Sequence, residues 1–247
     1  MVTQDIEYAV GNKTFVGYLT QPEPCIGKRP SILVCHDAGG LREHAKDRAR
    51  KLTELGYTAF ALDLFGEAIT GTEHAKAMIA SLSSDLPTLR GRMNAALELL
   101  KSQPNVDTTR TAAIGFCFGG QAVLELARSG AELTCVVGFH STLHTTAPED
   151  AKNIKCKVMV CLGAKDPIVP VEQRAAFVDE MIKAGIDWQM LLYGQAVHGF
   201  TDKTSDSYGI WALAYNELTD KRSWRAMLSL FEASYTLSSQ QSLFNNS

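Results

Sequence analysis

Three residues that lie far apart in the sequence could together carry out acyl transfer: Cys117, Asp166 and His198. A thiol attacks well only as a thiolate, and a free thiol is mostly protonated at neutral pH. It therefore needs a base, and the base needs an acid that orients it. The chain order nucleophile, acid, histidine is typical of such triads on parallel sheets. This chemistry requires a fold that brings the three side chains together.

The glycines around Cys117 predict how its side chain is held. Residues 115–120 read GFCFGG, between the apolar run TAAI and the helix-forming segment QAVLELAR. A side chain on a tight turn from strand to helix needs small neighbours two residues away on either side, because the turn brings the flanking backbone close. Gly115 and Gly119 meet that need, and Gly120 would let the helix pack close to the strand. The positive end of the helix would favour a thiolate.

Each of these signals has a plainer alternative. GFCFGG alone could be a glycine-rich turn with a buried, inert cysteine, or a phosphate-binding loop. However, the spacing does not fit a dinucleotide fingerprint, and no P-loop lysine follows. Asp166 alone could form a turn, and His198 alone could be a surface histidine. The occurrence of all three in the required order favours the triad.

The rest of the chain predicts an α/β fold with a mostly parallel, doubly wound sheet and helices on both faces. From Pro30 onward, short apolar runs alternate with amphipathic segments, which is typical of buried parallel strands joined by crossover helices. The expected strands are 31–35, 58–62, 111–116, 134–139, 158–162 and 188–193, and a closing helix is expected over 220–233. Ligands bind beyond the carboxyl ends of such strands. Cys117, Asp166 and His198 each follow a strand and should share that edge.

The N-terminal segment predicts an antiparallel hairpin at the edge of the sheet. Two β-rich stretches flank Gly11 and Asn12, a dipeptide suited to a hairpin turn. The chain shows no repeat, linker or Pro/Ser-rich boundary. We therefore expect a single domain over 1–237, followed by a polar tail over 238–247.

Composition narrows the classes of function. The 247 residues are 45% hydrophobic with a formal net charge of −3, so neither nucleic acid nor an anionic membrane is an expected partner. The sequence has no signal-peptide pattern and no apolar run long enough to span a membrane. These observations predict a soluble cytoplasmic protein that binds a small molecule. The six cysteines lack metal-site spacing, so no metal or cofactor is expected.

The sequence resembles the dienelactone hydrolase family of α/β hydrolases. The segments GFCFGG, GAKDPIVP at 163–170 and VHGFTD at 197–202 match its cysteine, acid and histidine loops, and the similarity covers nearly the whole chain. The resemblance implies an α/β-hydrolase fold with Cys117 as nucleophile, His198 as base and Asp166 as the residue that orients it. It also implies cleavage of esters or lactones without a metal.

The expected oxyanion hole uses two backbone amides. One is that of Phe118, the residue after the nucleophile. The resemblance points to Ala38, in the loop HDAGG at 36–40, as the other. The resemblance also implies that an acid at Asp37 lies near the thiol, although a turn-capping aspartate is an equal alternative.

Four residues are candidates for the substrate pocket: His36, Asp37, His140 and His144. The two histidines of GFHSTLH are spaced for a metal on a helix, but they lack a third ligand and lie in an apparent loop.

The substrate is less well defined than the chemistry. The resemblance places a carboxylate-binding arginine four residues after the catalytic histidine, where this chain has Asp202 followed by Lys203. A different small ester, lactone or thioester is therefore as good a candidate as a dienelactone. The rival functions are a non-catalytic ligand-binding protein and a thiol redox sensor, which would need a second cysteine near Cys117. The sequence does not indicate an oligomeric state.

Overall fold

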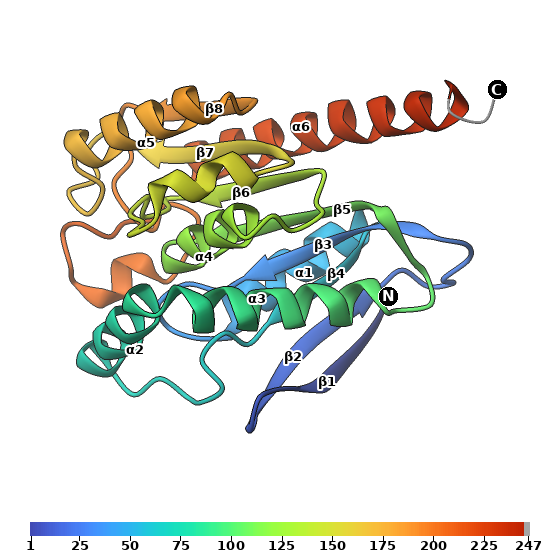
Figure 1. Cartoon of the computed structure of the whole chain (residues 1–247). Coiled ribbons are helices and arrows are strands. Elements are labelled where there is room, and N and C mark those ends of the chain that lie inside the picture. Colours follow the sequence, from blue (N-terminus) through green and yellow to red (C-terminus); the bar gives the residue numbers. More distant parts are fainter. Residues whose placement is uncertain (245–247) are drawn as a thin grey trace.

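A twisted sheet of eight strands runs through the protein (Figure 1). The computed structural model describes the backbone of residues 1–244 and the side chains of residues 1–235. The strands are β1 Val2–Val10, β2 Lys13–Gln21, β3 Arg29–Cys35, β4 Thr58–Leu62, β5 Val106–Phe116, β6 Cys135–Phe139, β7 Lys157–Gly163 and β8 Trp188–Tyr193. Their spatial order is β1-β2-β4-β3-β5-β6-β7-β8.

The N-terminal hairpin is confirmed. Strands β1 and β2 pair in antiparallel fashion from Val2–Gln21 to Val10–Lys13, and Gly11 in the turn has a φ of 58°. Strand β2 then pairs in antiparallel fashion with β4, and every later pairing is parallel. All carboxyl ends from β3 onward therefore lie at one edge of the sheet.

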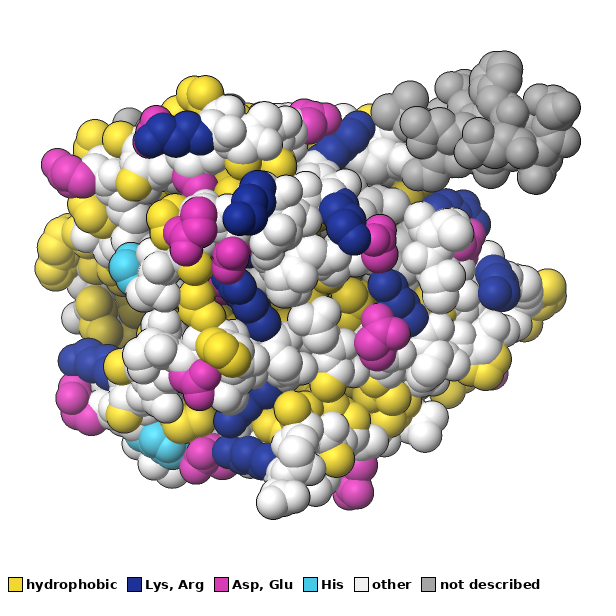
Figure 2. Space-filling model, viewed as in Figure 1, with side chains coloured by type: hydrophobic (Ala, Val, Ile, Leu, Met, Phe, Trp, Pro, Cys, Tyr) yellow, Lys and Arg dark blue, Asp and Glu magenta, His cyan; other side chains and the backbone are white. Residues whose placement is uncertain are grey.

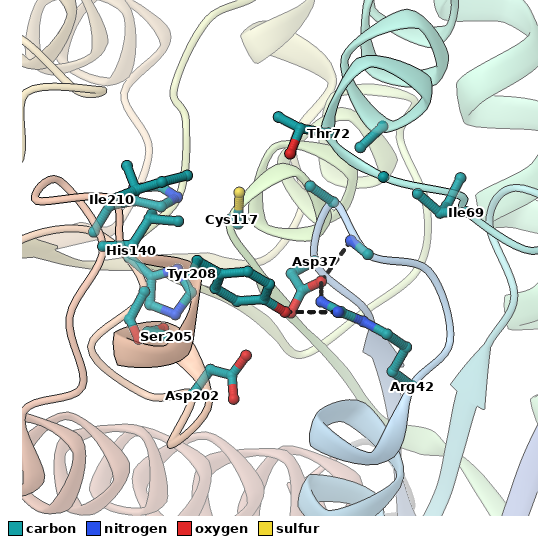
Figure 3. A pocket seen from close by; sticks show the side chains of 17 residues that line it. Asp37, Arg42, Ile69, Thr72, Cys117, His140, Asp202, Ser205, Tyr208 and Ile210 are labelled. Carbon is teal, nitrogen blue, oxygen red and sulfur yellow. Dashed lines mark hydrogen bonds and ion pairs between the residues drawn. The ribbon is translucent and has the colours of Figure 1, made fainter.

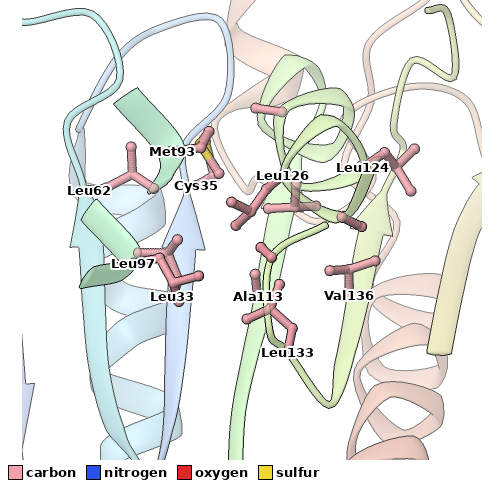
Figure 4. Packing of buried hydrophobic residues seen from close by; sticks show 14 of the residues in the cluster. Leu33, Cys35, Leu62, Met93, Leu97, Ala113, Leu124, Leu126, Leu133 and Val136 are labelled. Carbon is pink, nitrogen blue, oxygen red and sulfur yellow. The ribbon is translucent and has the colours of Figure 1, made fainter. Parts of the chain in front are cut away.

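Helices cover both faces of the sheet, as predicted. They are α1 Glu43–Glu54, α2 Thr72–Ser84, α3 Leu86–Lys101, α4 Phe118–Arg128, α5 Val171–Ala184 and α6 Glu217–Phe244, with short 3₁₀ helices η1 Pro148–Asn153 and η2 Ser205–Tyr208. Alternate residues of one strand enter opposite cores: Leu33 packs with α3 and α4 (Figure 4), whereas Ile32 packs with α1 and α6. The predicted mostly parallel, doubly wound sheet is confirmed.

Three elements differ from the sequence expectation. Strand β5 begins at Val106, five residues before the predicted start at 111. Helix α2 was not predicted, because among its residues only Ala75 and Leu82 are buried and the apolar pattern is weak. Helix α6 was expected over 220–233 but continues to Phe244, into the stretch predicted as a polar tail. No glycine or proline occurs between 234 and 244 to end it. The last three residues of that stretch lie outside the described residues.

A buried network of ion pairs anchors α4, the helix that begins beside Cys117. Arg128 at the end of α4 is fully buried; it donates to Glu180 of α5 over 2.7 and 2.9 Å and to Glu125 over 2.9 Å. Arg90 of α3 binds the other oxygen of Glu125 over 2.7 Å. Three helices on one face are thus tied together through matched charges.

Replacing Arg128 with methionine is expected to lower the free energy of unfolding by about 3 kcal/mol, because Glu180 would keep a buried charge without its partner. Urea unfolding followed by circular dichroism measures this effect. Lys183→Met breaks the exposed pair of Lys183 with Asp179 on α5, and it should change stability little. Equal effects of the two substitutions would contradict an anchoring role for Arg128.

On the face shown in Figure 2, basic and acidic side chains are interspersed, and neither sign of charge gathers into a patch. Within the described part of the chain, no helix is both long and apolar enough to cross a membrane.

Candidate active site

Cys117 lies on a strained turn between β5 and α4. Its φ of 55° and ψ of −120° are unusual for a residue with a side chain. A methyl group on Gly115 would lie 2.0 Å from the Gly119 carbonyl oxygen, and one on Gly119 would lie 2.2 Å from that of His36. One on Gly120 would lie 2.5 Å from the Ser141 side chain. The glycines are required because strand β3, the turn and helix α4 approach each other at backbone distance.

The structure brings the other two predicted catalytic side chains together. The Nδ1 atom of His198 lies 2.7 Å from Oδ2 of Asp166, and both residues are buried, at 2% and 3% exposure. The Oδ1 atom of Asp166 accepts a hydrogen bond from the amide of Ile168 over 2.8 Å. The His198 loop is held in turn by backbone hydrogen bonds to Ala212 and Ala214. The carboxylate therefore fixes the orientation of the imidazole.

Cys117 affects the pKa of His198. Burial alone would lower the pKa of His198, but the electrostatic interaction with Cys117 and the hydrogen bond that His198 donates to Asp166 outweigh it and raise the pKa to about 10. Within the described residues, Nε2 of His198 is buried and makes no hydrogen bond of normal geometry. This nitrogen is therefore free to exchange a proton with the sulfur or with a bound substrate.

Cys117 and His198 open into a pocket of about 240 Å³ at the carboxyl edge of the sheet (Figure 3). Its walls come from the loop after β3, the start of α2, and the loop after β8. The other lining residues are Asp37, Ala38, Gly39, Arg42, Ile69, Gly71, Thr72, Ala75, His140, Gly199, Asp202, Ser205, Tyr208, Ile210 and Leu213. The pocket is walled mainly by apolar atoms, which suits a small organic ligand.

Of the two predicted oxyanion-hole residues, Ala38 lines this pocket, whereas Phe118 does not line it but directly follows Cys117. Phe118 is the first residue of α4, so its amide precedes the first helical hydrogen bond. Ala38 lines the pocket, whereas the amides of Gly39 and Gly40 are both bonded to Asp37. The Ala38 and Phe118 amides are thus the backbone donors that this arrangement could direct at a ligand.

Asp37 both lines the pocket and caps its own turn. Its Oδ1 accepts hydrogen bonds from the Gly39 amide over 2.7 Å and from Arg42 over 3.0 Å. Burial raises the pKa of Asp37, but His44, Arg42 and the Gly39 amide together lower it below its usual value. Among the described residues, no hydrogen bond joins Asp37 to Cys117. The carboxylate is directed at Arg42 rather than at the thiol.

The remaining predicted histidines have different positions. His36 does not line the pocket: its ring is buried between the Asp37 carbonyl and the Leu64 amide, at 2.7 and 3.0 Å, because it follows β3 on the core side. His144 is exposed on its loop and is also absent from the pocket wall. His140 does line it, 2% exposed, with φ 37°. No group of three or more potential metal ligands occurs among the residues that the structure describes.

Sequence reasoning missed a buried chain of polar groups behind the pocket. Thr201 lies between two histidines, 2.8 Å from Nε2 of His140 and 3.2 Å from Nε2 of His44. The ring of His140 in turn packs edge to face on that of His198, with centroids 5.1 Å apart. His44 could have been suspected because it lies in the first turn of the helix after β3, at the carboxyl edge of the sheet. Arg42 and Tyr208, hydrogen-bonded over 2.6 Å across 166 residues, gave no such signal.

Known proteins are similar to this chain in sequence and fold. A model of the dienelactone hydrolase family matches residues 15–235. The solved structure of a protein named m3DLH is 45% identical, with a TM-score of 0.92, and the match covers 94% of this chain and 98% of that one. A dienelactone hydrolase-like promiscuous phosphotriesterase from metagenomic libraries is 41% identical, with a TM-score of 0.90 and the same coverage.

A curated relative extends the comparison. A putative carboxymethylenebutenolidase from Methylorubrum extorquens is 29% identical over 195 residues, which are 74% of this chain and 67% of the relative. The family match and the two solved structures confirm the predicted α/β-hydrolase fold. The chain therefore belongs to the dienelactone hydrolase family and is a hydrolase that acts on ester bonds.

Proposed function

We propose that this protein hydrolyses a small ester or lactone through a Cys117, His198 and Asp166 triad and a thioester intermediate. One observation carries the proposal: the 2.7 Å contact between Asp166 and His198 at the pocket into which the strained Cys117 turn opens. Strain of this kind persists where the surrounding structure holds a residue for a task. A ligand-binding protein needs no oriented imidazole at the thiol.

The first half of the reaction forms the thioester. The Cys117 thiolate attacks the carbonyl carbon, and the carbonyl oxygen takes up the negative charge within reach of the Phe118 and Ala38 amides. The tetrahedral intermediate collapses as the bond to the leaving oxygen breaks. The Nε2 proton of the His198 imidazolium passes to that oxygen, so an alcohol leaves and His198 becomes neutral.

The second half releases the acid. Neutral His198 accepts a proton from water as the water oxygen attacks the thioester carbon, and the second intermediate expels the Cys117 thiolate. The carboxylic acid product loses its proton to solvent, and the imidazolium–thiolate pair is restored. The Asp166 carboxylate accepts the hydrogen bond from His198 and stabilises the imidazolium.

Alkylation by iodoacetamide tests whether the thiol is activated. Cys117 and Cys25 are the partly exposed cysteines and the other four are buried, so these two compete for the reagent. At pH 6.5 we expect Cys117 to react at least about tenfold faster than Cys25, because the imidazolium holds its sulfur as thiolate. The raised pKa of His198, about 10, keeps the imidazolium at neutral pH, so the advantage is present there. It shrinks above about pH 8.5, where an ordinary thiol ionises, and the imidazolium itself is lost as the pH rises through 10.

Peptide mass spectrometry gives both rates in one sample. In His198→Ala the Cys117 rate at pH 6.5 should fall to that of Cys25, while the Cys25 rate stays unchanged. Equal labelling of the two thiols in the wild type would contradict the proposed triad.

A further inference from the structure

The pocket holds more negative than positive charge. Besides Cys117 and His198, its wall includes Asp37, Arg42 and Asp202 as charged side chains. His140 is neutral there, because burial and the neighbouring positive charges lower its pKa well below the usual value. The balance of charge therefore depends on how Arg42 is engaged.

Two nitrogen atoms of Arg42 donate to other groups of the wall. Its Nη2 donates to Asp37 over 3.0 Å, and its Nη1 donates to the Tyr208 hydroxyl over 2.6 Å, as the dashed lines in Figure 3 show. The charge of Arg42 is balanced by that of Asp37. Asp202 then remains as the carboxylate without a matching cation on the pocket wall.

The surroundings of Asp202 do not supply that cation. The residue is 7% exposed, and its carboxylate accepts hydrogen bonds from the amide and hydroxyl of Thr204 over 2.8 to 2.9 Å. Among the described residues it forms no salt bridge. Two basic groups behind the pocket wall have other roles. Arg48 pairs with Asp220 over 2.9 Å, and burial together with Arg48 lowers the pKa of His44.

Lys203 follows Asp202 in the sequence, but it is exposed and does not line the pocket. A buried, unbalanced carboxylate raises the energy of any second anion in the same low-dielectric space. It leaves uncharged groups unaffected and attracts cations.

We propose that Asp202 is a specificity-determining residue that makes this pocket select uncharged or cationic esters and reject esters that carry a carboxylate. The inference rests on the proposed ester hydrolysis at Cys117. It assigns a substrate class that the size and apolar wall of the pocket alone would leave open.

Two pairs of substrates, each matched in shape but not in charge, test the proposal. The first pair, 4-acetoxybenzoate and 4-acetoxybenzamide, differs in charge on the leaving group. The second pair, phenyl 4-carboxybenzoate and phenyl 4-carbamoylbenzoate, differs in charge on the acyl group. In each molecule the para position prevents the carboxylate from attacking its own ester. Phenol release measured by chromatography gives kcat/KM for all four.

In the wild type we expect kcat/KM for the amide substrate to exceed kcat/KM for the carboxylate substrate by about tenfold or more in at least one pair. The reason is that the carboxylate of the substrate and that of Asp202 repel each other across the pocket. Asp202→Asn keeps an oxygen that can accept from Thr204 and removes the charge, so it should reduce that ratio severalfold. Asp206→Asn is the matched control. Asp206 lies on the same loop but is exposed outside the pocket. Removing its charge should leave the ratio of the two kcat/KM values unchanged.

The outcomes separate the two proposals. Turnover of the amides with equal turnover of the carboxylates would overturn the role of Asp202 and leave ester hydrolysis intact. A preference for the amides that persists in Asp202→Asn would also overturn it. If none of the four substrates is hydrolysed by the wild type, the proposed hydrolysis itself fails.

Discussion

Cys117→Ala is expected to lower kcat/KM for phenyl acetate by at least about 10³-fold, since it removes the thiol that we propose forms the acyl-enzyme. His198→Ala should cause a loss of similar size, because it removes the group that donates a proton to the leaving oxygen and later activates water. The double variant should be little worse than either single variant, since the two residues act as one unit.

Cys25→Ala provides the matched control for the nucleophile. Cys25 is the other partly exposed cysteine and does not line the pocket, so its removal should leave kcat/KM within about twofold of the wild type. Circular dichroism spectra that match the wild type would show that the inactive variants are folded. Retention of a tenth or more of the wild-type activity in Cys117→Ala would rule out cysteine as the nucleophile.

Gly119→Ala is expected to lower the free energy of unfolding by at least about 3 kcal/mol and to reduce activity strongly. The new methyl group would lie 2.2 and 2.5 Å from the carbonyl oxygens of His36 and Cys35, which are backbone atoms of the sheet edge. Strand β3 and helix α4 would have to separate, and that movement would displace both Cys117 and the loop that holds Ala38. Urea unfolding and kcat/KM for phenyl acetate measure the two effects.

Gly91→Ala is the matched control for this substitution. Gly91 lies inside α3, with no atom within 4 Å of the added methyl group, so alanine should raise stability by about 0.5–1 kcal/mol. A neutral Gly119→Ala would show that the close approach of β3 and α4 is not required.

Gly120→Ala provides a milder variant if Gly119→Ala does not fold. Its methyl group would meet the Ser141 side chain at 2.5 Å, which a second substitution can remove. We expect Gly120→Ala to be destabilising and Ser141→Gly to recover part of that loss in the double variant. Additive effects of the two substitutions would argue against a direct steric contact.

The sequence by itself determined the architecture and predicted which three residues form the proposed triad. Buried parallel strands require continuous apolar runs, and glycine is required where backbone segments touch, so both leave local marks such as those at 31–35 and 115–120. The rule that ligands bind at the carboxyl edge of the sheet then predicts that Cys117, Asp166 and His198 share that edge.

Only the tertiary structure decided which other polar residues reach the pocket. His36 and His140 both follow a strand, yet His36 turns into the core beside Leu64, whereas His140 faces the pocket. The hydrogen bond between Arg42 and Tyr208 joins segments that are 166 residues apart in the sequence. Such contacts depend on side-chain direction and on the path of loops, and neither imposes a periodic pattern on the sequence.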